Sequence, residues 1–171
     1  MAALRAHPKV YWIWNHRRWC LENTPRGPVS VVESESFGWK KANWDKELFV
    51  VEKMLDADPR NFHAWDYRRY VIASMPVPRP EKSELAYTSR KIEANISNFS
   101  AWHQRSKVLT SLLYLETDPG EDKDLVESEI TAIQELLDEQ PDSKCMFFIF
   151  NWYRIAIDVQ LPRVYGVHRV L

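Results

Sequence analysis

One short pattern occurs three times in this chain and limits the possible folds more than any other feature. It reads aromatic residue, two residues, Trp, two residues, Arg, and it stands at Tyr11–Arg17, Phe62–Arg68 and Phe99–Arg105. Trp65 and Trp102 are 37 residues apart, an interval typical of two-helix repeats. The repetition therefore predicts an all-α fold, an α-α superhelix (solenoid) of antiparallel helical hairpins.

Within each copy the motif is expected to open a helix. The aromatic residue and the Trp three positions later are predicted to share one face of that helix. Large aromatics usually anchor a core, and each Arg is expected to bridge neighbouring hairpins or to stack on an aromatic ring. The positions interpreted as structural are Trp14, Arg17, Phe62, Trp65, Arg68, Phe99, Trp102 and Arg105.

A second amphipathic helix is predicted before each later motif. Its apolar positions are Trp44, Leu48, Val51 and Leu55 in one unit, and Leu85, Ile92 and Ile96 in the next. Asp58 is expected to cap the helix that follows, with Pro59 at its first helical position.

The intervals between motifs contain helix-breaking residues. Trp14 and Trp65 are 51 residues apart, and the stretch from Glu22 to Lys41 is rich in Pro, Gly and Ser, so an inserted loop is expected there. A further helix is predicted from about Asp122 to Glu139, after a loop at 118–120.

The pattern weakens toward the end of the chain. Pro141 is expected to end the preceding helix, and Phe147 and Phe150 stand where the repeat calls for Trp and Arg. The predicted organisation is one helical-repeat domain over 1–171, with motifs near 9–22, 60–73 and 97–110, a degenerate fourth unit at 122–159 and an irregular tail at 160–171.

Composition excludes several classes of function. The formal net charge is -1, which gives no general attraction to nucleic acid. The stretch from Met146 to Val159 is interrupted by polar residues and is too short to span a membrane, and the N-terminus lacks the order of a secretory signal. Cys20 and Cys145 are far apart, so a reduced, cytoplasmic setting is expected.

The three motifs resemble the repeats of protein prenyltransferase α subunits. The segment Asn61–Tyr70 is especially similar to the Rab geranylgeranyltransferase (type II) member, and Lys9–Trp19 and Asn95–Arg105 strengthen the likeness. The resemblance covers roughly Pro8 to Leu113.

This resemblance implies a crescent of hairpins around a separate β subunit, with the chain inactive alone. The β subunit would carry the zinc and the lipid cavity, and this chain would bind no cofactor and no metal. In the implied reaction, a cysteine thiolate of a Rab GTPase, presented by a Rab escort protein, attacks geranylgeranyl diphosphate. The five histidines of the chain show no spacing suited to zinc.

The resemblance also implies which residues approach the diphosphate. Lys9 and Tyr11 match the family positions that contact it, and His63 and Arg60 are weaker candidates. A lone lysine is ordinarily a solvated surface charge, so only the family match singles out Lys9. Phe62 stands where farnesyltransferase-type α subunits have Tyr, which favours the Rab type.

Two alternatives remain open from the sequence. The chain could be a non-catalytic helical-repeat adaptor, because the resemblance covers only part of what family members usually contain. It could also serve a farnesyltransferase or a type I geranylgeranyltransferase, since the cavity that measures lipid length is expected on the β subunit.

Overall fold

The computed structural model describes residues 2–24, 33–115, 119–139, 147 and 149–151. Within these residues the regular structure is entirely helical, as the repeat predicted. The helices are α1 (Ala2–Ala6), α2 (Tyr11–Asn23), α3 (Glu33–Ala57), α4 (Phe62–Ser74), α5 (Glu81–Ala94), α6 (Phe99–Leu115) and α7 (Pro119–Glu139).

The chain divides into two compact units, 1–80 and 81–171, and each is described by itself. The first unit contains α1 to α4 and the second contains α5 to α7. The expectation of a single domain over 1–171 stays a prediction.

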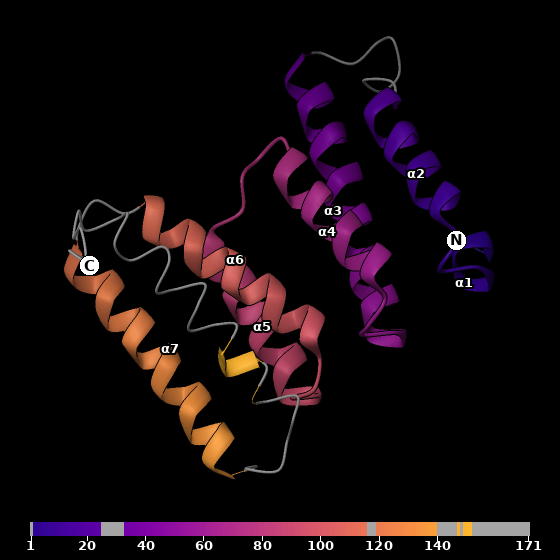
Figure 1. Cartoon of the computed structure of the whole chain (residues 1–171). Coiled ribbons are helices and arrows are strands. Elements are labelled where there is room, and N and C mark those ends of the chain that lie inside the picture. The colour runs from indigo at the N-terminus through magenta and orange to yellow at the C-terminus, as the bar shows by residue number, and fades with distance from the viewer. Residues whose placement is uncertain (1, 25–32, 116–118, 140–146, 148, 152–171) are drawn as a thin grey trace, which may run out of the picture. The chain divides into compact units, whose positions relative to one another are not determined.

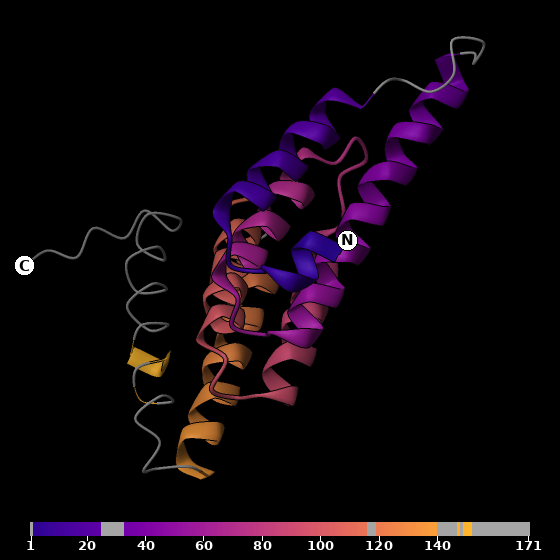
Figure 2. The same ribbon diagram turned by 90° about the vertical axis from the view of Figure 1, so that its right-hand side faces the viewer.

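In the first unit, α3 and α4 form an antiparallel hairpin, with α2 packed beside it (Figures 1 and 2). The predicted apolar face of α3 is confirmed, because Trp44, Leu48, Val51 and Leu55 are all buried. They recur at helical spacing, and burying each such side chain stabilises the fold by about 1.5–3 kcal/mol. Because α3 and α4 form one hairpin, the packing of this face also fixes the position at which α4 begins.

In the second unit, α5 and α6 form the equivalent hairpin, and α7 contacts α6 (Figure 1). Ile92 of α5 is buried as predicted, whereas Leu85 is only half-buried and Ile96 lies beyond the end of the helix. Tyr87 and Thr88 complete the buried face of α5 instead.

The motif opens α2, α4 and α6, each of which begins at the motif aromatic. Trp14, Trp65 and Trp102 are buried, with 4%, 1% and 3% of their surface exposed. The leading aromatic of each motif, in contrast, is not buried with the Trp.

The three motif aromatics, Tyr11, Phe62 and Phe99, are exposed by 57%, 66% and 47%. Side chains on a helix lean toward its N-terminus. A side chain on the first helical residue therefore projects past the end of the helix, beyond the neighbours that cover the Trp.

The helix cap before α4 also differs from the prediction. Asn61, not Asp58, is the N-cap, and its side-chain oxygen accepts hydrogen bonds from the backbone N–H groups of His63 and Ala64. Pro59 precedes the helix. Asp58 follows the last residue of α3, and its carboxylate accepts a hydrogen bond from the backbone N–H of Arg60 at 3.2 Å. Asp58 therefore shapes the turn, and Asn61 caps the helix.

Two predicted loops are shorter in the structure. α2 continues to Asn23 and α3 begins at Glu33, so most of the predicted insertion is helical, with 25–32 outside the described residues. A single Gly38 costs a helix only about 1 kcal/mol, which the packing of α3 outweighs. α7 begins at Pro119, three residues before the predicted start, because proline fits the first turn of a helix.

Of the predicted fourth unit, the described residues include 122–139, 147 and 149–151. α7 ends at Glu139, the predicted end, and its Ile133 is buried. Phe147 is 58% exposed and Ile149 is buried. Pro141, residues 152–159 of the fourth unit and the tail at 160–171 lie outside the described residues.

Candidate functional site

The turns that precede α2 and α4 meet at the backbone carbonyl of Pro8. The Pro8 carbonyl accepts from the indole N–H of Trp14 at 2.8 Å and from the side-chain amide of Asn61 at 3.1 Å. Asn61 is 2% exposed, so this bond is sheltered from water and fixes the two turns against each other. The residues flanking the turns are brought onto one surface.

Lys9 and Tyr11 lie at this junction, in contact with the second repeat. The Lys9 ammonium is 3.7 Å from the carboxylate of Asp58. The ring of Tyr11 lies 6.2 Å from the imidazole of His63, centroid to centroid. The structure therefore brings together two sequence-predicted residues of the first repeat and one of the second.

The fourth predicted residue, Arg60, lies in the same turn as Asp58, and its backbone N–H donates to that carboxylate. Its side chain is exposed. Lys9 and Arg60 thus give the junction two cationic side chains that reach solvent.

Several large apolar side chains next to these polar residues in the sequence are exposed. Val10, Tyr11, Trp12 and Phe62 are 43%, 57%, 74% and 66% exposed. The rings of Tyr11 and Trp12 meet edge to face at 5.8 Å. Exposed aromatic side chains gathered in one place are typical of an interface with another molecule. Sequence reasoning treated Phe62 as structural and overlooked Trp12, although Trp12 adjoins a predicted site residue.

The three motif tryptophans are structural and share one interaction. The indole N–H of Trp14, Trp65 and Trp102 donates to the carbonyl six residues earlier, on Pro8, Pro59 and Ile96, at 2.8 Å in each case. A buried indole N–H needs such a partner. The bond ties each motif helix to the turn before it, which sets the position of that turn.

The motif arginines are expected to bridge neighbouring hairpins; Arg17 and Arg105 reach a helix outside their own hairpin, whereas Arg68 pairs with Glu52 within its own. In the first unit, Arg17 of α2 donates to both carboxylate oxygens of Glu47 in α3 at 2.7 Å, and Tyr67 of α4 donates to Glu47 at 2.9 Å. Burial tends to lower the pKa of Arg17, but its hydrogen bonds to Glu47 raise the pKa overall. Burial, and then the negative charge of Glu47, raise the pKa of the Tyr67 phenol.

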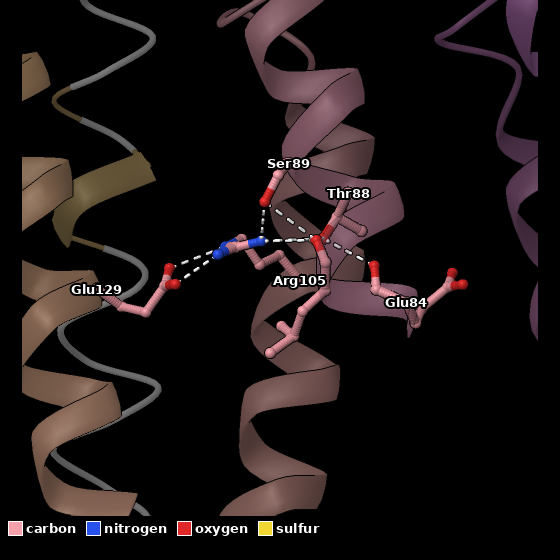
Figure 3. Close-up of polar contacts among 6 residues, drawn as sticks. Glu84, Thr88, Ser89, Arg105 and Glu129 are labelled. Carbon is pink, nitrogen blue, oxygen red and sulfur yellow. Dashed lines mark hydrogen bonds and ion pairs between the residues drawn. The ribbon is translucent and has the colours of Figure 1, made fainter. Parts of the chain in front are cut away.

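Arg68 and Arg105 also join helices through ion pairs. Arg68 is 1% exposed and contacts Glu52 of α3 at 3.0 Å. Arg105 of α6 pairs with Glu129 of α7 and donates to Thr88 and Ser89 of α5 (Figure 3). These guanidinium groups are occupied in holding helices together, which supports the structural interpretation.

The described residues offer no metal centre, since no three His, Cys, Asp or Glu side chains among them lie close enough to hold an ion. The exposed Cys20 contacts His16, with 3.4 Å between the sulfur and the imidazole nitrogen. Two ligands do not make the closed tetrahedral set that zinc prefers. Among the described helices, none is long and apolar enough to cross a membrane.

Comparison with known proteins identifies similar chains. The model of the protein prenyltransferase alpha subunit repeat matches residues 1–24, 44–75 and 81–112. The geranylgeranyl transferase type-2 subunit alpha of Saccharomyces cerevisiae is 36% identical over 156 residues, which cover 90% of this chain and 44% of the relative.

The Homo sapiens protein of the same description is 34% identical over 163 residues, covering 93% of this chain and 26% of the relative. The chain therefore spans less than half the length of these curated relatives. The repeat matches fall on the three motif regions and on the helices before them. From its repeats and their geometry, this chain belongs to the protein prenyltransferase alpha subunit repeat family.

Proposed function

We propose that this chain serves as part of the α subunit of a type-2 geranylgeranyl transferase, which transfers geranylgeranyl groups to C-terminal cysteines of Rab GTPases. Family membership and the relatives named geranylgeranyl transferase type-2 subunit alpha support this proposal. The chain would contribute a surface facing the departing diphosphate, while a β subunit completes the enzyme.

One observation carries the proposal: Lys9 contacts Asp58, which shares a turn with Arg60, and Tyr11 contacts His63, so the start of the first repeat lies against the start of the second. When the thiolate attacks the first lipid carbon and the carbon–oxygen bond breaks, negative charge grows on the diphosphate. The Lys9 ammonium and the Tyr11 hydroxyl are donors suited to that charge. His63 and Arg60 would add hydrogen bonds or charge from the second repeat.

The exposed aromatic surface of Val10, Tyr11, Trp12 and Phe62 would be covered in the assembled enzyme by the β subunit. Removing such rings from water is a main source of interface stability. The zinc that activates the thiol would be held by the β subunit. Geranylgeranyl diphosphate, a Rab GTPase and its escort protein would bind to the assembled enzyme in the cytoplasm.

Co-expression of the chain with a type-2 β subunit tests the assembly. We expect a heterodimer that transfers labelled lipid from geranylgeranyl diphosphate to a Rab bound to its escort protein, and farnesyl diphosphate should react more slowly. Failure of the two chains to co-purify would reject the proposal in favour of a non-catalytic adaptor. Preferred transfer of farnesyl would assign the chain to the other prenyltransferase type.

Replacing Lys9 by Ala tests the diphosphate surface. We expect the rate of transfer to fall at least about tenfold, yet less than the roughly 100- to 1,000-fold lost with a fully preorganised donor, because Lys9 is exposed. The heterodimer should remain intact. Lys53→Ala, another exposed lysine in an ion pair, is the matched control and should keep the wild-type rate. An unchanged rate for Lys9→Ala would remove Lys9 from the site.

A further inference from the structure

The carboxylate of Asp58 has two partners at the junction of the first two repeats. One oxygen accepts a hydrogen bond from the backbone N–H of Arg60 at 3.2 Å, and the other lies 3.7 Å from the ammonium of Lys9. The backbone of Asp58 is itself fixed, because its N–H donates to the Met54 carbonyl at 2.9 Å. A rigidly placed anion therefore stands beside a flexible cation.

The third repeat shows whether the turn requires a charged side chain at the position of Asp58. Asn95 stands seven residues before Trp102, as Asp58 stands seven before Trp65. The Asn95 side-chain oxygen accepts from the backbone N–H of Ser97 at 3.1 Å, which is the same turn without a charge. The negative charge of Asp58 is thus not required for the local fold.

The ion pair is also not required to join the two turns. The sheltered hydrogen bond from Asn61 to the Pro8 carbonyl already does so. The side chains of Lys9 and Asp58 are 75% and 36% exposed, and exposed ion pairs contribute at most about 1 kcal/mol to stability. What such a pair can do is restrict where the lysine side chain lies, since free lysine samples many rotamers.

We propose that Asp58 is a positioning residue that holds the Lys9 ammonium at the junction where the diphosphate departs. This inference rests on the proposed function of Lys9. Asp58 does not touch substrate. It reduces the number of lysine conformations that must be lost when negative charge develops, and it therefore acts through Lys9 alone.

Asp58→Asn isolates this role, because Asn95 shows that the amide preserves the turn. In the assembled enzyme we expect kcat to fall about three- to fivefold, the fold-change that corresponds to an exposed ion pair. KM for geranylgeranyl diphosphate should not rise, because the variant also removes a negative charge from the site. Asp58→Glu, which restores the carboxylate, should recover part of the loss.

Asp56→Asn is the matched control, since Asp56 forms an exposed ion pair with Lys53 at 3.2 Å on α3. It should leave both constants unchanged. In the Lys9→Ala background, Asp58→Asn should have no further effect, because no ammonium remains to be positioned. An equal loss in that background would mean that Asp58 acts by another route and would overturn the inference.

The outcomes separate the two proposals. If Lys9→Ala slows transfer and Asp58→Asn does not, the positioning role of Asp58 is wrong and the diphosphate surface stands. If Lys9→Ala leaves the rate unchanged, the diphosphate role of Lys9 fails, and the role of Asp58 fails with it. A rise in KM for geranylgeranyl diphosphate in Asp58→Asn would also contradict positioning through Lys9.

Discussion

The first and third repeats place the same motif arginine in different surroundings. Arg17 in the first unit is 22% exposed and shares the carboxylate of Glu47 with the phenol of Tyr67. Arg105 in the second unit is 12% exposed and bonds to Glu129, to the carbonyl of Leu85 and to two hydroxyl groups of α5. The motif sets the position of the arginine on its own helix, and the neighbouring helices determine which groups the guanidinium binds.

The tryptophans show the opposite behaviour. Each donates to the carbonyl six residues earlier at the same distance, in both units. A partner close in sequence gives the same contact in every repeat, whereas a partner on another helix varies with the sequence of that helix. The tryptophan contacts are therefore set by local sequence, and the arginine contacts by the tertiary structure.

The largest expected effect comes from removing a motif tryptophan. Trp65→Ala and Trp102→Ala should each lower the free energy of unfolding by about 3–5 kcal/mol, because a large buried side chain and a satisfied indole are lost. Denaturation of the chain by urea, followed by circular dichroism, measures this. Trp12→Ala, at an exposed position, should change stability little. Equal losses for Trp12→Ala and Trp65→Ala would contradict the assignment of Trp65 to the core and Trp12 to the surface.

A smaller effect is expected from the arginines, and it should differ between the units. Arg105→Ala should cost about 3 kcal/mol, because it leaves Glu129, which is 13% exposed, without its paired charge. Arg17→Ala should cost less, about 2 kcal/mol, since Tyr67 still donates to Glu47. The same denaturation experiment compares them. A larger loss for Arg17→Ala would reverse the ranking of the two networks.

The smallest effect concerns alkaline pH and the tyrosines of α4. Burial, together with the hydrogen bond to Glu22 at 2.7 Å, raises the pKa of Tyr70 from 10.0 to about 12. The folded state therefore holds the phenol proton more tightly than the unfolded state. The stability that this proton contributes is complete below pH 10 and is lost as pH rises from 10 to about 12.

Tyr70→Phe should consequently lose stability less steeply than the wild type between pH 10 and pH 12. It should also cost about 1 kcal/mol near neutral pH, because the hydrogen bond to Glu22 is gone. Urea midpoints measured across this range provide the test. Tyr67, whose pKa is also raised, should leave a residual slope of the same sign. Parallel curves for the two proteins would show that Tyr70 is not responsible.

Much of the architecture could be predicted from residue spacing. The face of α3, the presence of a helix at each motif and the burial of the three tryptophans all follow from helical periodicity and side-chain size. The exposure of Tyr11, Phe62 and Phe99 did not, since periodicity ignores how a side chain at a helix end projects beyond it. The start of α3 was missed because packing overrides the weak helix propensity of Gly and Ser.

The candidate site was only partly predictable. Resemblance named Lys9, Tyr11, His63 and Arg60, but nothing in the spacing showed that the turns before α2 and α4 would meet. Asp58 was interpreted as a helix cap, since Asp before Pro is a common capping pattern. Its contact with Lys9 depends on a neighbour 49 residues away in sequence, which no local pattern contains.

By itself, the sequence determined that the chain forms repeated helical hairpins anchored by tryptophan, because those properties depend on periodicity and on bonds to nearby backbone groups. The tertiary structure alone decided which carboxylate meets each arginine, and which turn faces Lys9. Such contacts join residues distant in the chain, and their geometry exists only once the helices have packed.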